Sequence, residues 1–410
     1  MAVVVFRILG ACTFLVAAMV LSLYPASTLC SGVLDPAGLA RSHGYDAEVH
    51  TAQTDDGYLL SVFRVRNLSS AARGAPPVLL VPGLACNAAI WVLLGPGKAL
   101  AYLLADRGYD VWLTDYRGAM FSRRHVNLSD QDSAFWDFSL DDIGRLDIPA
   151  VLRLVLRETG ARSLSYVGHS MGASVLSVMA SSSPQLADNI SHAYMFAPAA
   201  YMGHASQPAV YGSADAVSRL HDDLGLFASG EIPLNSWWMR MTIHGVCSTS
   251  VASPLCLMVG GVYAGHDSEQ INKTAIPFFV DYIPDSISVK SVRHFAQHFG
   301  KEHSFRRFDY GLVGNMATYG QNSSPEYNIS MSKFPASIYY GSNDFLVNPK
   351  DVLEFSMHLP RAIRPPYKVS LDRFNHIDFF LATDAKDLLY NQLMRDMLQD
   401  EDHSKMSSMT

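Results

Sequence analysis

The stretch Gly168-His169-Ser170-Met171-Gly172 has the pattern G-x-S-x-G. It follows the β-prone run 163–167 and precedes residues 173–180, which favour a helix. A serine on a sharp strand-to-helix turn has a strained backbone, and small residues on either side let strand and helix cross. The order strand, G-x-S-x-G, helix therefore predicts a nucleophile elbow that exposes the Ser170 hydroxyl. Because the pattern arises by chance in roughly one chain in ten of this length, further residues must support it.

A base and an acid follow at the expected places. A serine nucleophile needs a histidine to accept its proton and a carboxylate to orient that histidine. On a parallel sheet these groups come from strand ends at one edge, in the chain order serine, acid, histidine. Asp344 lies in the turn after the expected strand 336–340, and His376 lies in the loop after the expected strand 367–371. We predict Ser170, Asp344 and His376 as the catalytic residues.

Two backbone N–H groups are expected to bind the oxyanion. One belongs to Met171, the residue after the nucleophile, and the other to the loop after an early strand. Pro82-Gly83-Leu84 occupies that loop. Leu84 is the candidate donor because Pro82 carries no N–H. An ordinary glycine turn is the alternative interpretation of this loop.

Other acids and histidines have simpler explanations. Asp378 directly precedes an apolar helical stretch, which favours helix capping, and Asp351 lies in the first turn of a helix, where the macrodipole stabilises it. His169 is interpreted as structural because it cannot easily turn back towards Ser170. His294 and His298 have the spacing of a helical metal pair, but neither the zincin glutamate nor a third ligand accompanies them. No metal and no cofactor is expected.

Strand and helix patterns alternate along most of the chain and predict an α/β fold with a mostly parallel sheet. The expected strands are 48–54, 58–65, 77–82, 109–114, 163–167, 190–197, 336–340 and 367–371. The expected helices are 98–108, 139–159 with a kink or break at Pro149, the elbow helix, 349–359 and 381–398. We place the core in residues 31–200 and 333–399.

The alternation fades over residues 201–332. This segment is too long for a loop and too irregular for a second doubly wound domain, so we expect an inserted, mainly helical cap or lid. Residues 400–410 are polar and are predicted to be a disordered tail.

Residues 1–30 have the pattern of a secretory signal peptide. Arg7 is the one charge in this segment, residues 8–24 are apolar, and small residues follow. An uncleaved anchor is the alternative, but polar sequence follows at once without a basic stop-transfer flank. Cleavage would leave no integral membrane span. The net charge of −7 and the lack of basic runs argue against nucleic-acid binding and against polybasic membrane docking.

Cysteines and glycosylation motifs agree with a secreted or lysosomal location. In an oxidising compartment Cys247 would pair with Cys256, and Cys86 would remain as a buried thiol. Six N-x-S/T motifs together favour a glycoprotein. They begin at Asn67, Asn127, Asn189, Asn272, Asn322 and Asn328.

Several further segments resemble the acid lipase family, which includes the gastric and lysosomal acid lipases. They are His43-Gly44-Tyr45, Asp55-Asp56-Gly57-Tyr58, Ser122-Arg123-Arg124-His125, Phe135-Trp136-Asp137-Phe138-Ser139, Asp147-Ile148-Pro149-Ala150, Phe196-Ala197-Pro198, Gly341-Ser342-Asn343-Asp344 and Asn375-His376-Ile377-Asp378-Phe379. The resemblance covers nearly the whole chain after the signal segment and implies an α/β-hydrolase fold. It also implies the same catalytic residues, the same oxyanion donors and a cap disulfide between Cys247 and Cys256.

The resemblance further implies a lid over an apolar acyl pocket and a neutral lipid ester as substrate, at a lipid–water interface or the surface of a lipid droplet or lipoprotein. Three positions depart from the family. The family usually has histidine at Pro82, glutamine at Met171, and asparagine with a small residue at Asp115-Tyr116. A backbone donor survives a change of side chain, so Met171 can keep its role.

The leading hypothesis is a serine lipase that hydrolyses triacylglycerol or sterol esters through an acyl-enzyme on Ser170. A carboxylesterase or acyltransferase acting on smaller esters is the alternative within catalysis. A non-catalytic lipid-binding protein on a lipase scaffold is a third hypothesis. It is disfavoured because all three expected catalytic residues are present.

Overall fold

The computed structural model describes residues 33–70, 74–205, 212, 216–218, 220–223, 225–247, 258, 261, 263–266, 269–301 and 303–409. The expected signal segment 1–30 and Cys256 lie outside these ranges. No helix of the described residues is long and apolar enough to cross a membrane.

A nine-stranded sheet forms the centre of the molecule, in the order β1-β2-β4-β3-β6-β7-β10-β11, with β5 paired to β2. The strands are β1 (Asp46–Gln53), β2 (Tyr58–Arg66), β3 (Pro77–Val81), β4 (Asp110–Thr114), β5 (Arg124–His125), β6 (Leu164–His169), β7 (Ile190–Phe196), β10 (Ala336–Tyr340) and β11 (Tyr367–Lys368). From β4 to β11 neighbouring strands run parallel, while β1 and β2 form an antiparallel edge. Every residue of β3 and β4 is buried, as in a sheet covered on both faces. The predicted α/β fold is confirmed.

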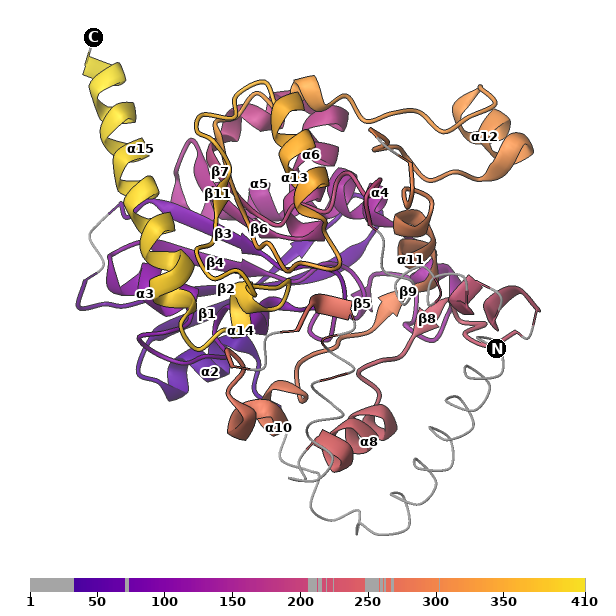
Figure 1. The fold of residues 1–410 in the computed structure, drawn as a ribbon, viewed down its shortest axis with the longest axis horizontal. Coiled ribbons are helices and arrows are strands. Elements are labelled where there is room, and N and C mark those ends of the chain that lie inside the picture. Colours follow the sequence, from indigo (N-terminus) through magenta and orange to yellow (C-terminus); the bar gives the residue numbers. More distant parts are fainter. Residues whose placement is uncertain are drawn as a thin grey trace.

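Helices cover both faces of this sheet: α5, α6 and α13 lie above it and α2 and α3 below it in Figure 1. The helices outside the 201–332 insertion are α2 (Pro36–Ser42), α3 (Leu100–Asp106), α4 (Leu140–Asp142), α5 (Ile148–Thr159), α6 (Met171–Ser182), α13 (Pro349–His358), α14 (Asp378–Leu381) and α15 (Asn391–Met409). Shorter single turns lie at Ala88–Trp91, Ser133–Trp136, Pro184–Asn189, Ile329–Met331 and Lys386–Tyr390.

The expected irregularity near Pro149 is a π-helical turn. This turn, Ile143–Asp147, joins α4 to α5, and Pro149 then lies at the start of α5, where its missing N–H costs little. Gly144 within the turn packs on α6 so closely that a Cβ would lie 2.5 Å from Val178 Cβ. The wider turn therefore lets α4 and α5 follow the surface of α6.

The segment between β7 and β10 adds helices and a small sheet. They are α8 (Trp237–Cys247), α10 (Ile276–Phe279), α11 (Val289–Ala296), α12 (Gly311–Tyr319) and the antiparallel pair β8 (Glu231–Ile232) and β9 (Ile287–Ser288), with a further 3₁₀ turn at Lys273–Ala275. Figure 1 shows α12 projecting from the rest of the molecule. The β8–β9 pair had no signal in the sequence, because each strand has only two residues.

The prediction of a disordered tail from residue 400 is wrong for the first residues of that segment. Helix α15 continues to Met409. Asp400 is buried and accepts hydrogen bonds from Tyr194 Oη (3.0 Å) and Arg364 Nη1 (3.1 Å), and Glu401 accepts one from Tyr109 Oη (2.7 Å). These long-range partners order a segment whose own composition is polar.

The cysteine and glycosylation predictions have mixed outcomes. Cys247 is disulfide-bonded, but its pairing with Cys256 stays a prediction. Cys86 is a free cysteine whose pKa burial raises to about 12, so its thiol is protonated at neutral pH. The six glycosylation asparagines are exposed or half-buried, and their glycosylation stays a prediction.

A buried arginine connects three parts of the core. Arg117, in the loop after β4, donates from Nε to Asp147 Oδ1 (2.7 Å) and from Nη1 to Asp56 Oδ2 (2.6 Å). Its guanidinium also lies 4.0 Å above the Tyr58 ring. Arg117 is 2% exposed and Asp147 1% exposed, so the two charges depend on each other for compensation.

Replacing Arg117 with Met should lower the free energy of unfolding by about 3–5 kcal/mol, because Asp147 would keep a buried charge without its partner. Urea denaturation followed by circular dichroism measures this loss. The control Arg157→Met removes an exposed arginine that pairs with its neighbour Glu158 and should change stability by less than about 0.5 kcal/mol. Equal effects of the two substitutions would contradict the assigned role of Arg117.

Candidate active site

The Ser170 turn has the geometry of a nucleophile elbow. Ser170 has φ 55° and ψ −120°, a region that residues with a Cβ rarely adopt. A Cβ on Gly168 would lie 2.5 Å from Gly172 O, and a Cβ on Gly172 would lie 2.4 Å from Val81 O. Both glycines are therefore sterically required where β6, α6 and the end of β3 meet.

Asp344 and His376 form the predicted acid–base pair. His376 Nδ1 lies 2.7 Å from Asp344 Oδ2, and Asp344 Oδ1 accepts hydrogen bonds from the N–H groups of Leu346 (3.0 Å) and Val347 (2.8 Å). Because an ionised carboxylate can only accept, Nδ1 of His376 carries the proton. Nε2 of the neutral ring is then free to act as a base.

His169 places this pair beside the elbow. Its Nε2 lies 3.0 Å from His376 O and the two ring centroids are 4.6 Å apart. Burial lowers the pKa of His169 well below its usual value, and the nearby His376 ring lowers it further. A neutral His169 that holds the His376 backbone agrees with the structural role expected for it. In the described part of the chain the Ser170 hydroxyl makes no hydrogen bond to His376, a contact that in many enzymes closes only with substrate.

The expected oxyanion loop passes directly over the nucleophile. A Cβ on Gly83 would lie 3.0 Å from Ser170 Cβ, and Tyr116 Oη donates to Gly83 O at 3.1 Å. Met171 is the first residue of α6, so its N–H has no partner within the helix. Leu84 follows Gly83 and is half-buried. Both expected donors thus lie on segments that border Ser170.

The turn that carries His376 is held by Asn375, which had no role assigned from sequence, and by Asp378, which was expected to cap a helix. Asp378 Oδ2 accepts from Asn375 N (2.8 Å), while Asn375 Oδ1 accepts from Asp378 N (3.2 Å). Asp378 thus fixes the His376 turn at the start of α14. In the sequence, the pattern Asn-x-x-Asp indicates a turn in which each side chain accepts a hydrogen bond from the backbone N–H of the other residue.

A short piece of the insertion lies against both catalytic loops. Ala264 O accepts the His376 N–H (3.1 Å), and Gly265 O accepts a hydrogen bond from Asn375 Nδ2 (2.8 Å). Gly265 has φ 105°, and a Cβ there would lie 2.0 Å from Asn343 O. No local pattern could reveal these hydrogen bonds, because the partners are at least 110 residues apart in sequence.

Two buried aspartates lie behind the oxyanion loop. Asp115 accepts from Ala88 N (2.6 Å), and burial raises its pKa well above the usual value. Asp285, from the insertion, accepts from Asn87 Nδ2 (3.0 Å) and Met120 N (2.8 Å), and burial raises its pKa to about 6 against these hydrogen bonds.

Asp285 also contacts the oxyanion loop itself, because its N–H donates to Ala85 O at 2.8 Å. Asp115, where the resembling family has asparagine, thus belongs to a buried acidic pair that supports this loop. The Asp285 member of the pair had no signal in the sequence.

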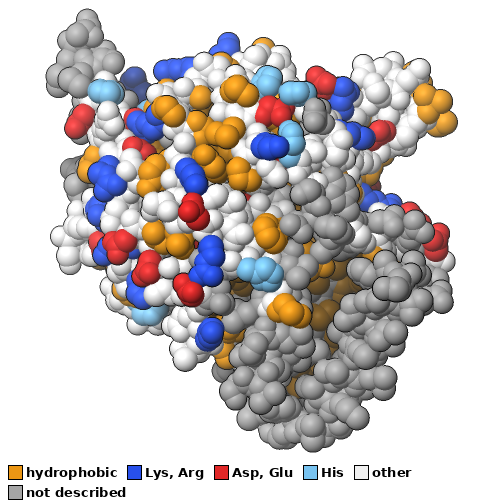
Figure 2. Space-filling view, viewed as in Figure 1, with side chains coloured by type: hydrophobic (Ala, Val, Ile, Leu, Met, Phe, Trp, Pro, Cys, Tyr) orange, Lys and Arg blue, Asp and Glu red, His pale blue; other side chains and the backbone are white. Residues whose placement is uncertain are grey.

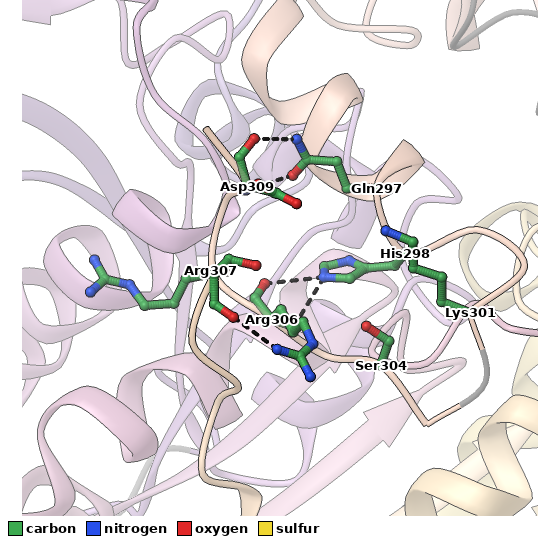
Figure 3. Close-up of a pocket in the computed structure, with 8 residues that line it drawn as sticks. Gln297, His298, Lys301, Ser304, Arg306, Arg307 and Asp309 are labelled. Carbon is green, nitrogen blue, oxygen red and sulfur yellow. Dashed lines mark hydrogen bonds between the residues drawn. The ribbon is translucent and has the colours of Figure 1, made fainter. Parts of the chain in front are cut away.

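His298 lines a small polar cavity away from the triad (Figure 3), and the His294 ring centroid lies 5.2 Å from that of His298. The cavity, about 30 Å³ in volume, is too small for an acyl chain, and none of the catalytic residues lines it. Both histidines are buried and direct Nε2 to Arg306 O, at 2.9 and 3.1 Å. Burial lowers their pKa values to about 4 and about 3, so both rings are neutral packing groups.

Comparison with family models gives two matches. Residues 76–382 match the alpha/beta hydrolase fold, and residues 37–95 match the partial alpha/beta-hydrolase lipase region. Among solved structures, a Sulfolobus solfataricus protein (TM-score 0.58, 13% identity, 87% of this chain and 94% of that one) and the enol-lactonase of Burkholderia xenovorans (TM-score 0.50, 12%, 85% and 100%) share the fold.

Curated relatives are similar over most of the chain. Lipase 1 of Drosophila melanogaster is 34% identical over 87% of this chain and 78% of its own. Rat gastric triacylglycerol lipase is 31% identical over 87% and 90%, and human lipase member K is 30% identical over 86% and 87%.

The raised pKa of Asp285 predicts a pH dependence of stability. A carboxyl group whose folded pKa lies above its unfolded value stabilises the fold at low pH, and that stabilisation is lost as the pH rises through about 6. Between about pH 4 and about pH 8 the free energy of unfolding of the wild type should therefore fall by on the order of 3 kcal/mol relative to that of Asp285→Asn.

Urea denaturation across this pH range measures the difference. The control Asp372→Asn changes a carboxylate whose side chain is 85% exposed. The difference in free energy of unfolding between this variant and the wild type should stay constant over the same pH range. A wild type that gains stability over Asp285→Asn as the pH rises would reverse the assigned sign.

Proposed function

This chain belongs to the acid lipase group of the α/β-hydrolase family and is an ester hydrolase, and from that premise we propose that Ser170 attacks the ester carbonyl of a neutral lipid. The observation that carries this proposal is the Asp344–His376 pair, held beside the strained Ser170 elbow by His169. Three groups in the order serine, acid, histidine on one sheet edge match the demands of acyl transfer.

The first step is proton transfer from Ser170 to His376. Asp344 accepts the Nδ1–H of the ring, which keeps Nε2 unprotonated and stabilises the imidazolium that forms. The serine oxygen then attacks the carbonyl carbon, and the carbonyl oxygen becomes an oxyanion. We assign the amides of Leu84 and Met171 as its hydrogen-bond donors.

The leaving alcohol takes the proton from His376, and the acyl group remains on Ser170. Water then enters, gives a proton to His376 and attacks the acyl-enzyme, which releases the fatty acid and restores the serine. Every step uses side chains and amides of the described residues.

Neutral lipid ester is the substrate class we favour, either triacylglycerol or sterol ester. Several large apolar side chains of the insertion are exposed and suit contact with a lipid–water interface, including a droplet or lipoprotein surface. Examples are Trp237 (68% exposed), Leu312 (64%) and Val313 (83%). Figure 2 shows apolar side chains at the tip of the segment that carries α12.

We further propose that residues 201–332 act as a cap over the acyl site and that the chain enters the secretory pathway, for secretion or the lysosome. Contacts of Ala264 and Asp285 with the catalytic and oxyanion loops support the first proposal. The accessible glycosylation asparagines and the disulfide-bonded Cys247 support the second.

Replacing Ser170 with Ala should lower kcat/KM for a long-chain p-nitrophenyl ester by at least about 10⁴-fold, because no other group can form the acyl-enzyme. The same variant should lose labelling by a fluorophosphonate probe. The control Ser182→Ala changes an exposed serine at the end of the same helix and should keep both. Full activity of Ser170→Ala would sink the mechanism, and an unlabelled Ser170 in folded wild type would favour the non-catalytic lipid-binding hypothesis.

Substrate choice separates a lipase from an esterase of small molecules. Emulsified triolein and cholesteryl oleate are compared with dissolved short-chain esters in acidic and neutral buffer, and a competing alcohol tests for acyl transfer. We expect hydrolysis of at least one emulsified lipid to exceed that of the short esters, since exposed apolar surface favours the interface. Preference for dissolved esters would instead support the carboxylesterase alternative.

A further inference from the structure

A second cluster of ionisable side chains lies outside the catalytic site, where the insertion leaves the core. His204 follows β7, while Asp351 and Glu354 lie one turn apart on α13 and so share one face of that helix. One ligand atom from each of these three residues lies within 4.8 Å of the others. His303 joins them from later in the insertion, with its Nδ1 beside Glu354 Oε1.

Both carboxylates are buried without a permanent cation. Asp351 is 1% exposed and Glu354 is 8% exposed, and within the described ranges neither forms an ion pair with lysine or arginine. The polar neighbour of Glu354 Oε1 is the His303 imidazole, through its Nδ1. Two buried carboxylates whose charged neighbours are imidazole rings need positive charge for compensation, which a bound cation would supply.

The imidazole of His204 is held in place for such an occupant. Its Nδ1 lies 2.7 Å from Asp351 Oδ1, and its backbone N–H donates to Asp351 Oδ2 at 3.0 Å. Asn348 Nδ2 donates to His204 O at 3.0 Å, which ties the same residue to the start of α13. Near Glu354, His358 Nδ1 contacts the backbone oxygen of that residue at 2.9 Å.

We propose that His204, Asp351 and Glu354 bind a divalent transition-metal ion of the zinc type, with His303 as the fourth ligand. Imidazole nitrogen together with carboxylate oxygen suits zinc, whereas magnesium and calcium prefer oxygen ligands alone. Partial exposure of His204 (30%) and His303 (64%) gives the ion a path from solvent.

The ion would join three segments that are far apart in sequence. Residues just after β7, the loop at residue 303 and α13 would share one centre, so the site would fasten the insertion to the core. None of its ligands belongs to the catalytic set. Zinc should therefore raise thermal stability and leave the chemistry at Ser170 unchanged.

The test uses the full chain after EDTA treatment and dialysis, titrated with zinc and, in parallel, with cobalt(II) as a spectroscopic probe. Wild type should bind one zinc per chain at this site, melt at a higher temperature with zinc, and show the visible absorption of low-coordinate cobalt. The double variant His204→Gln/Glu354→Gln should bind zinc about 10–100-fold more weakly and lose the cobalt bands.

The matched control is His50→Gln, which removes a histidine from another histidine–carboxylate pair, His50–Glu48, and should bind zinc as wild type does. Fluorophosphonate labelling of Ser170 shows that each variant is folded. The single variant Glu354→Gln gives the same readout if the double variant unfolds. Zinc binding that is absent from wild type, or unchanged in the folded variants, would overturn the proposal.

Discussion

The close crossing of β3, β6 and α6 is the constraint on which the site depends. At Gly172 the first turn of α6 lies so near to Val81 and Pro82 that a Cβ would meet their carbonyl oxygens at 2.4 and 2.5 Å. This approach is possible only without side chains, and it forces Ser170 into its positive-φ conformation. The same crossing carries the Pro82-Gly83-Leu84 loop over Ser170. The close packing at Gly172 therefore positions both the expected nucleophile and the expected oxyanion donors.

The charges near this crossing are compensated in two different ways. Arg117 and Asp147 neutralise each other in the core and connect the β4 loop to α5. Asp115 and Asp285 accept hydrogen bonds from neutral donors, and burial raises both pKa values. The first arrangement is suited to rigidity at any ordinary pH, whereas the second makes support of the oxyanion loop sensitive to pH.

Local patterns were sufficient to predict the elbow, the buried strands and the order of Ser170, Asp344 and His376. Each of these features is encoded within about ten consecutive residues, by glycine spacing, apolar runs or a loop after a strand. The resemblance to acid lipases was confirmed by the family and relative matches. The roles of Leu84 and Met171 as donors stay predictions.

What sequence could not predict depends on partners distant along the chain. Asp400 is ordered by Tyr194 and Arg364, although the segment around it is polar and would be disordered on composition alone. The hydrogen bonds of Ala264 and Gly265 to the His376 turn likewise have no local signature. The π-helical turn before Pro149 accompanies the close packing of Gly144 on Val178, which is a contact between separate elements.

These distant contacts attach the insertion to the core at three places. Asp285 attaches it to the expected oxyanion loop at Ala85, and Ala264 attaches it to the turn that carries His376. The third attachment is the contact of His204 with Asp351 on α13. Two of the three attachments are backbone hydrogen bonds to the loops that perform the proposed chemistry. A shift of the insertion would therefore change the positions of the donor loop and of the histidine together. Residues 201–332 thus help to hold the loops that surround Ser170, as the central sheet does.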